Sequence, residues 1–169
     1  VSGAAPIKGF DASQFKTQFA CEIKDFVAAD FIDRKEIRKM DLYEQYALVA
    51  AMEAVKDSGM DLETVDKDNI GVVLGVGIGG IHTFEEQISE YACTHEEKGP
   101  RFSPFFIPKM IADIASGRIS IQYGFHGPNY TTTSACASST NAIADAFNLI
   151  RLGKANVMVT GGAEAVSYT

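Results

Sequence analysis

One stretch decides the fold: residues 129–141, with the sequence NYTTTSACASSTN. Its first residues are β-branched and aromatic, which favours a strand. Small residues then lead into residues 142–150, where apolar side chains recur at helical spacing. These apolar positions are Ile143, Ala146, Phe147 and Ile150. Beyond Gly153, which is typical of a helix end, residues 155–160 have the pattern of another buried strand. The stretch therefore predicts a strand that passes directly into the N-terminus of a helix.

Cys136 lies at the predicted junction between that strand and that helix. Unpaired backbone N–H groups and the positive end of the helix dipole lie there, and both favour a thiolate over a thiol. The small neighbours Ala135 and Ala137 leave room for a substrate carbonyl to approach the sulfur. Two interpretations stay open from the residues alone: a nucleophilic cysteine, or a small core residue packed between sheet and helix.

Two motifs carry a family resemblance: TSACASS at residues 133–139 and VMVTGGAE at residues 157–164. Together they resemble the nucleophile region of the β-ketoacyl-[acyl-carrier-protein] synthases, and most of all the type II condensing enzymes of bacterial and organellar fatty-acid synthesis. The resemblance implies that the incoming acyl chain is transferred to Cys136. It also implies an α/β fold over residues 1–169, the N-terminal half of a thiolase-like fold with a mixed sheet and covering helices. The family's first strand would then precede Val1, and its second half would follow Thr169.

Composition narrows the classes of function. The chain has 169 residues, of which 46% are hydrophobic, enough for one substantial core. No apolar run approaches the ~20 residues that span a bilayer, no targeting segment opens the chain, and we expect no membrane association. A net charge of −7 disfavours nucleic acid as a partner. The three cysteines form no CxxC pair, which favours free thiols in a reducing compartment. We therefore expect a cytoplasmic protein without a metal site or a cofactor.

A basic cluster at residues 34–39 stands out in this acidic chain. A solvated helix face is one interpretation, and a docking patch that steers an acidic partner is the other. The cluster resembles the carrier-docking motif of the family, and acyl carrier proteins are strongly acidic. The resemblance implies that Lys35, Arg38 and Lys39 dock the acyl- and malonyl-loaded carrier protein.

The segment GVGIGG at residues 75–80 follows an apolar run, residues 70–74, that predicts a buried strand. It matches the GxGxxG fingerprint of dinucleotide-binding domains. A helix predicted over residues 41–58 already precedes this strand, and no second strand ending in an acidic residue follows about 20 residues on. The alternative is a glycine turn that lets the backbone pass close to a neighbour. The resemblance implies that this loop lines an acyl pocket, with Ile78 facing the growing chain.

The segment SPFFIP at residues 103–108 resembles a Ser-Pro-Phe-Phe segment of the family. Ser103 and Pro104 predict the start of a helix that continues toward Gly117. Phenylalanines in such a place are most often core residues. The resemblance implies a homodimer in which Phe106 lies at the interface and closes the acyl pocket of the partner.

The resemblance as a whole implies an acyltransferase that performs a decarboxylative Claisen condensation in fatty-acid elongation. An acyl thioester on Cys136 would react with malonyl-carrier protein, in two half-reactions with ping-pong kinetics. The family's histidines and lysine for decarboxylation would lie beyond Thr169, and we assign no role to the three histidines present. We therefore expect the 169-residue chain alone to be inactive in condensation. Two other interpretations stay open: a thiolase-fold acyltransferase acting on coenzyme A thioesters, and a non-catalytic domain in which Cys136 is structural.

Overall fold

The computed structural model describes residues 2–99 and 101–165. The helices are α1 (Arg34–Ile37), α2 (Leu42–Asp57), α3 (Ile81–Lys98), α4 (Phe106–Met110), α5 (Ile114–Tyr123) and α6 (Ser138–Arg151). The strands are β1 (Ala5–Pro6), β2 (Phe19–Ala20), β3 (Ile70–Gly75), β4 (Asn129–Thr132) and β5 (Val157–Gly162). Single 3-10 turns lie at η1 (Ala28–Asp30), η2 (Lys67–Asn69) and η3 (Ala135–Ala137).

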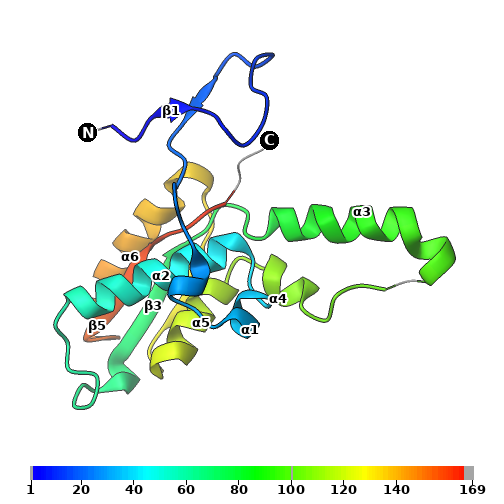
Figure 1. Ribbon diagram of the computed structural model, residues 1–169. Coiled ribbons are helices and arrows are strands. Elements are labelled where there is room, and N and C mark those ends of the chain that lie inside the picture. The colour runs from blue at the N-terminus through cyan, green and yellow to red at the C-terminus, as the bar shows by residue number, and fades with distance from the viewer. Residues whose placement is uncertain (1, 100, 166–169) are drawn as a thin grey trace.

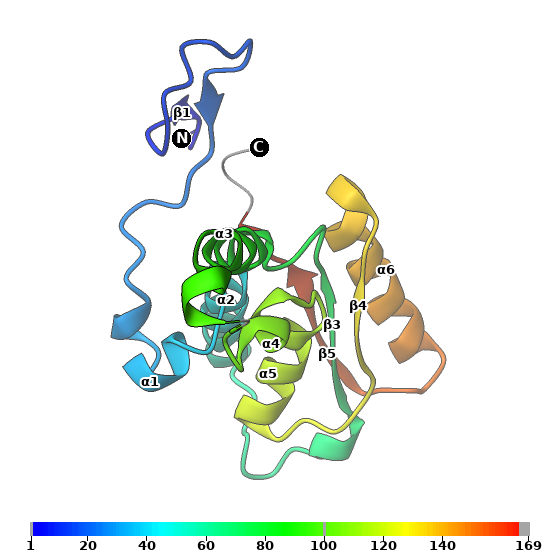
Figure 2. The ribbon, with the colours of Figure 1, turned by 90° about the vertical axis from the view of Figure 1, so that its right-hand side faces the viewer.

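A parallel sheet in the order β4-β3-β5 forms the centre of the molecule. Val72 in the middle strand is in register with Asn129 on one side and Val159 on the other. β3 is buried along its whole length, which confirms the strand predicted from its apolar run. Helices α2 and α5 cover one face of the sheet and α6 covers the other, so the predicted α/β class is confirmed (Figure 2). The short antiparallel pair of β1 and β2 stands apart from this body (Figure 1).

Helix α2 begins and ends where the sequence predicted. Asp41 caps it, and the Glu44 side chain accepts a hydrogen bond from the Asp41 N–H in return, which completes a capping box. The buried side of the helix carries Tyr43, Leu48 and Val55, which pack into the main core. Among the described residues, no helix combines the length and the apolar composition that a membrane crossing needs.

The single helix predicted from Ser103 to Gly117 is wrong. Two helices, α4 and α5, occupy this region, and the chain between them is extended at Ile111 (φ −71°, ψ 137°). The hydroxyl of Tyr43 donates to the Ile111 carbonyl at 2.5 Å, which holds the interruption in place. Gly117 lies inside α5, and the helix instead ends at Gly124, whose positive φ of 69° suits a glycine.

Helix α6 is confirmed, but its apolar stripe does not face the sheet. Its buried residues are the small ones, Ser138, Ala142 and Ala146. The larger members of the predicted stripe, Ile143, Phe147 and Ile150, are exposed, with 59% of Phe147 accessible. We call these three side chains the outer face of α6. Small side chains let the helix lie close against β3 and β5, and the bulky ones are left on the opposite side.

Candidate active site

Cys136 lies where the sequence predicted, between the end of β4 and the start of α6. It is the central residue of η3, and its side chain is exposed. Helix α6 begins two residues later, at Ser138. Cys136 is therefore not a buried packing residue, and its thiol can be reached by a substrate at the N-terminus of a fourteen-residue helix.

Hydrogen bonds from small polar side chains hold the turn that carries Cys136. The Thr132 hydroxyl donates to the carbonyl of Ser138 at 3.0 Å, and the Asn141 amide donates to the Ser134 hydroxyl at 2.6 Å. The Ser138 hydroxyl makes two further bonds within the turn. No role was predicted for these residues from the sequence. Their signal was the density of Ser, Thr and Asn on both sides of the cysteine, since such side chains bond to nearby backbone.

The loop after β3 runs beside this turn. A Cβ added at Gly77 would lie 4.0 Å from the carbonyl oxygen of Ala135 and 2.8 Å from a carboxylate oxygen of Glu164. The side chain of Ile78 is 57% exposed, and its N–H donates to the same Glu164 carboxylate at 2.7 Å. The structure thus brings the loop of Ile78 to the side of Cys136. Glu164 was not singled out from the sequence.

The glycines of this loop are explained by close backbone contacts. Gly79 has φ +90°, and a Cβ added at Gly80 would overlap the carbonyl of Lys109. The Gly80 N–H donates to the Met110 carbonyl at 3.0 Å. The N–H groups of Ile78 and Gly80 are therefore bound to protein oxygens, which supports the close-approach interpretation over a phosphate-binding loop.

Phe106 is the first residue of α4, the helix whose last residues, Lys109 and Met110, contact the loop after β3. It is half-buried against α3, with its ring 5.4 Å from that of Phe102 and 6.2 Å from that of Phe84.

The basic cluster forms the short helix α1 and the turn that follows it. Asp33 caps the helix by accepting from the Lys35 N–H at 2.7 Å. The Lys39 ammonium pairs with the Glu36 carboxylate at 2.6 Å, so its positive charge is partly neutralised within the chain. In the described part of the chain no carboxylate pairs with Lys35 or Arg38, and both side chains are exposed.

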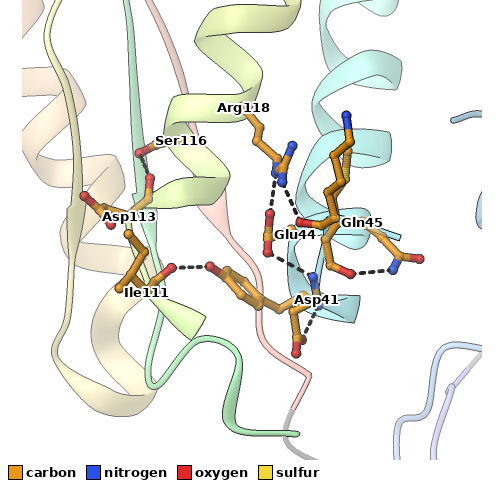
Figure 3. A network of polar contacts seen from close by, with 10 residues as sticks. Asp41, Glu44, Gln45, Ile111, Asp113, Ser116 and Arg118 are labelled. Carbon is orange, nitrogen blue, oxygen red and sulfur yellow. Dashed lines mark hydrogen bonds and ion pairs between the residues drawn. The ribbon is translucent and has the colours of Figure 1, made fainter. Parts of the chain in front are cut away.

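A buried polar network joins this cluster to the helices behind it (Figure 3). The Arg118 guanidinium donates to the Glu44 carboxylate at 2.5 Å and to the Lys39 carbonyl at 2.6 Å. Burial raises the pKa of Glu44, while the Asp41 N–H and the Arg118 cation lower it in part. Burial likewise raises the pKa of Tyr43. The pairing of Glu44 with Arg118 was not predicted from the sequence. The spacing of Asp41 and Glu44 is that of a capping box, which could have drawn attention to Glu44.

Among the described residues, no group of three His, Cys, Asp or Glu side chains gathers closely enough to hold a metal ion. His126 pairs with Asp68 at 2.8 Å, and His95 bonds to the Tyr91 carbonyl at 3.0 Å. Neither histidine is bound to the turn of Cys136.

The family profile and the curated relatives that this chain matches point to the same family. Residues 6–168 match the profile of the family described as "Beta-ketoacyl synthase, N-terminal domain". The chain is 46% identical over 166 residues to a 3-oxoacyl-[acyl-carrier-protein] synthase 2 of Staphylococcus aureus, covering 98% of the chain and 40% of that protein. It is 44% identical over 165 residues to the protein of the same name from Synechocystis sp., covering 97% of the chain and 39% of that protein. The chain thus spans about two fifths of the length of these curated relatives.

Solved structures agree with this. The ishigamide ketosynthase/chain length factor matches with a TM-score of 0.81 and 27% identity, over 98% of this chain and 41% of that one. A type II PKS acyl-carrier protein in complex with its ketosynthase, bound to the hexaketide, matches with a TM-score of 0.79 and 28% identity, over 86% of this chain and 41% of that one. These matches confirm the thiolase-like ketosynthase fold predicted from the sequence.

Proposed function

Since the chain belongs to the β-ketoacyl synthase family, we propose that it carries the acyl-accepting cysteine of a 3-oxoacyl-[acyl-carrier-protein] synthase of fatty-acid elongation. The observation that carries the proposal is the exposed thiol of Cys136 at the start of α6, beside the loop of Ile78. The similarity to proteins named 3-oxoacyl-[acyl-carrier-protein] synthase 2 supports the choice of reaction.

In the first half-reaction the Cys136 thiolate attacks the carbonyl carbon of an acyl-carrier thioester. A new carbon–sulfur bond forms, the oxygen becomes an oxyanion, and collapse of the adduct expels the carrier thiol. The Cys136 N–H is the natural donor to that oxyanion, since it lies at a helix N-terminus. Malonyl-carrier then loses CO₂, and the carbanion attacks the acyl-Cys136 thioester. The carbon–sulfur bond to Cys136 breaks, the Cys136 thiolate leaves with its electron pair, and the product is a 3-oxoacyl-carrier two carbons longer. We assign no residue of this chain to the decarboxylation, and we expect the 169-residue chain alone not to condense.

The carrier protein docks, in this proposal, on the exposed cations of the basic cluster. Lys35 and Arg38 provide most of the attraction, because Lys39 already pairs with Glu36. Reversing both charges, with Lys35→Glu and Arg38→Glu, raises the KM for the carrier protein at low salt. Lys154→Glu, at an exposed lysine beyond α6, is the matched control. An unchanged KM in the double variant would contradict this docking site.

The acyl pocket and the dimer belong to the same proposal. The exposed Ile78 side chain faces the growing chain, so Ile78→Phe shifts product length toward shorter acyl groups. Phe106, on α4, lies at the interface of a homodimer and closes the pocket of the partner subunit. The exposed neighbours Phe105 and Ile107 support an interface there. Sedimentation of the natural protein tests the dimer, and a monomer at assay concentration would contradict it.

Two alternatives make different predictions. A thiolase-fold enzyme acting on coenzyme A thioesters would acylate Cys136 from acyl-coenzyme A and ignore the carrier protein. A non-catalytic domain would bind its ligand equally well after Cys136→Ser. The three cysteines are all exposed and free, which favours a reducing compartment such as the cytoplasm over an oxidising one.

Intact mass spectrometry of the natural protein tests the proposal. Incubation with acyl-carrier protein should add one acyl group, and peptide mapping should place it on Cys136. Cys136→Ser should abolish the adduct. Acylation from acyl-coenzyme A alone would favour the first alternative, and the absence of any adduct on Cys136 would refute the nucleophile.

A further inference from the structure

The residue before Cys136 has an unusual backbone conformation. Ala135 has φ +50°, and the only other described non-glycine residue with a positive φ is Asp25. An L-residue in the left-handed region is strained, and it persists only where its surroundings hold it. The contacts around Ala135 therefore identify what sets the shape of the turn.

The side chain of Ser138 holds this turn from the inside. Its hydroxyl accepts a hydrogen bond from the Ser134 N–H at 2.8 Å and donates one to the Ala135 carbonyl at 2.7 Å. One bond lies on the N-terminal side of the strained Ala135, at the Ser134 N–H, and the other is to the carbonyl of Ala135 itself. Ser138 is only 3% exposed, so water does not compete for them. The Ser138 backbone N–H also bonds to the Ala135 carbonyl, so this oxygen is held by two donors of one residue.

The second of these bonds bears directly on Cys136. The Ala135 carbonyl and the Cys136 N–H belong to one planar trans peptide group, so they point in opposite directions. A hydroxyl that fixes the carbonyl therefore fixes the direction of the N–H. None of the residues in the described ranges accepts a hydrogen bond from the Cys136 N–H, so the N–H is free for a ligand on the exposed side of the turn.

We propose that Ser138 is a positioning residue for acyl transfer, whose hydroxyl aims the Cys136 N–H at the oxyanion of the acyl adduct. This assignment rests on the proposed function of Cys136. As the thiolate attacks, the carbonyl electron pair moves to oxygen and is stabilised by the aimed N–H. The carrier thiolate then leaves with the electron pair of the broken carbon–sulfur bond and takes a proton from solvent. Ser138 touches neither the substrate nor the sulfur, and acts only through the peptide group.

Two reactions of one thiol separate this role from a merely structural one. Alkylation by iodoacetamide displaces iodide at a saturated carbon and forms no oxyanion, whereas acylation by a carrier thioester does. In the natural protein, Ser138→Ala should slow the acylation of Cys136 roughly ten- to a hundredfold. Alkylation of Cys136 between pH 6 and 9 should stay within about twofold of wild type. Ser139→Ala is the matched control: it removes the next hydroxyl along α6, which bonds to none of the described residues, and should change neither rate.

Ser138→Thr keeps the hydroxyl and should restore acylation to within a few-fold of wild type. If Ser138→Ala lowers alkylation and acylation in equal proportion, Ser138 supports only the fold and the assignment is wrong. An unchanged acylation rate would also overturn it. A wild-type protein that is alkylated at Cys136 but never acylated would overturn the proposed function itself, and this assignment with it.

Discussion

Replacing Arg118 by methionine removes the cation that faces a fully buried carboxylate. Glu44 has no exposed surface, and the side chain of Arg118 is 17% exposed. In the variant the Asp41 N–H is the remaining donor to Glu44. An uncompensated buried charge costs about 3–5 kcal/mol. Glu44 can escape that cost by taking up a proton. At pH 7, about 2.7 pH units above the ordinary glutamate pKa, this costs about 3.7 kcal/mol at 1.36 kcal/mol for each pH unit. We therefore expect Arg118→Met to lose about 3–4 kcal/mol of unfolding free energy at pH 7.

The loss should depend on pH in a defined direction. Burial already raises the pKa of Glu44, and the loss of Arg118 raises it further, so the folded variant binds more protons than the unfolded chain. Its stability is therefore greatest below the unfolded pKa of about 4.3 and falls as pH rises, by up to about 1.4 kcal/mol per pH unit. The Glu44 pKa of the wild type is itself raised, so its stability also falls with pH, and between pH 5.5 and pH 7 the penalty relative to wild type should grow by up to about 2 kcal/mol.

Urea unfolding of the natural protein, followed by circular dichroism at both pH values, measures this. In a Glu44→Gln background, where the buried group cannot titrate, the effect of Arg118→Met should be smaller and equal at the two pH values. A loss below 1 kcal/mol at pH 7, or one that does not change with pH when Glu44 is present, would refute the reasoning.

Three further predictions follow from close contacts and exposed surface. Gly75→Ala places a Cβ against the backbone of Ser138 and Ser139, so we expect the free energy of unfolding in urea to fall by about 3 kcal/mol and the alkylation of Cys136 to slow. Gly117→Ala is the control: this glycine lies inside α5 with open space around it, so the change should be neutral or slightly stabilising. Tyr43→Phe leaves the Ile111 carbonyl without its hydroxyl donor and should cost about 1–2 kcal/mol, seen as a lower midpoint of thermal unfolding. The 169-residue chain alone should self-associate through the outer face of α6, where burying each large side chain yields about 1.5–3 kcal/mol. Phe147→Gln with Ile150→Gln should shift it toward monomer in light scattering, and a wild-type chain that is a monodisperse monomer with cooperative melting would contradict this.

Local sequence patterns were enough to predict β3 and the junction that carries Cys136. The buried strand predicted over residues 155–160 is shifted and less buried: β5 runs from Val157 to Gly162, and none of its residues is fully buried. Residues 70–74 form a buried strand because an apolar run between turn residues has few other stable conformations. Cys136 falls at a helix N-terminus because the change from β-branched to small residues is a local signal. For the glycines of residues 75–80 the sequence left two interpretations open, and the contacts with Lys109 and Met110 support the close backbone approach.

Other features depended on residues far apart in the chain. The break between α4 and α5 is held by Tyr43, 68 residues before Ile111, and no local pattern near residue 111 records that hydroxyl. The pairing of Glu44 with Arg118 spans 74 residues. The bracketing of Ala135 by Ser138 is local in the chain, yet it requires a backbone conformation that the residue types do not demand.

In helix α6, local sequence and tertiary structure determine different features. Its sequence determined the helix, its start beside Cys136 and the existence of one apolar side, because these follow from the spacing of neighbouring residues. Only the tertiary structure decided that Ala142 and Ala146 face the sheet while Phe147 faces outward. Periodicity records which side chains share a side of a helix, but the distance available between helix and sheet decides which side fits. At the close approach of α6 to β3 and β5, that side is the one with small residues.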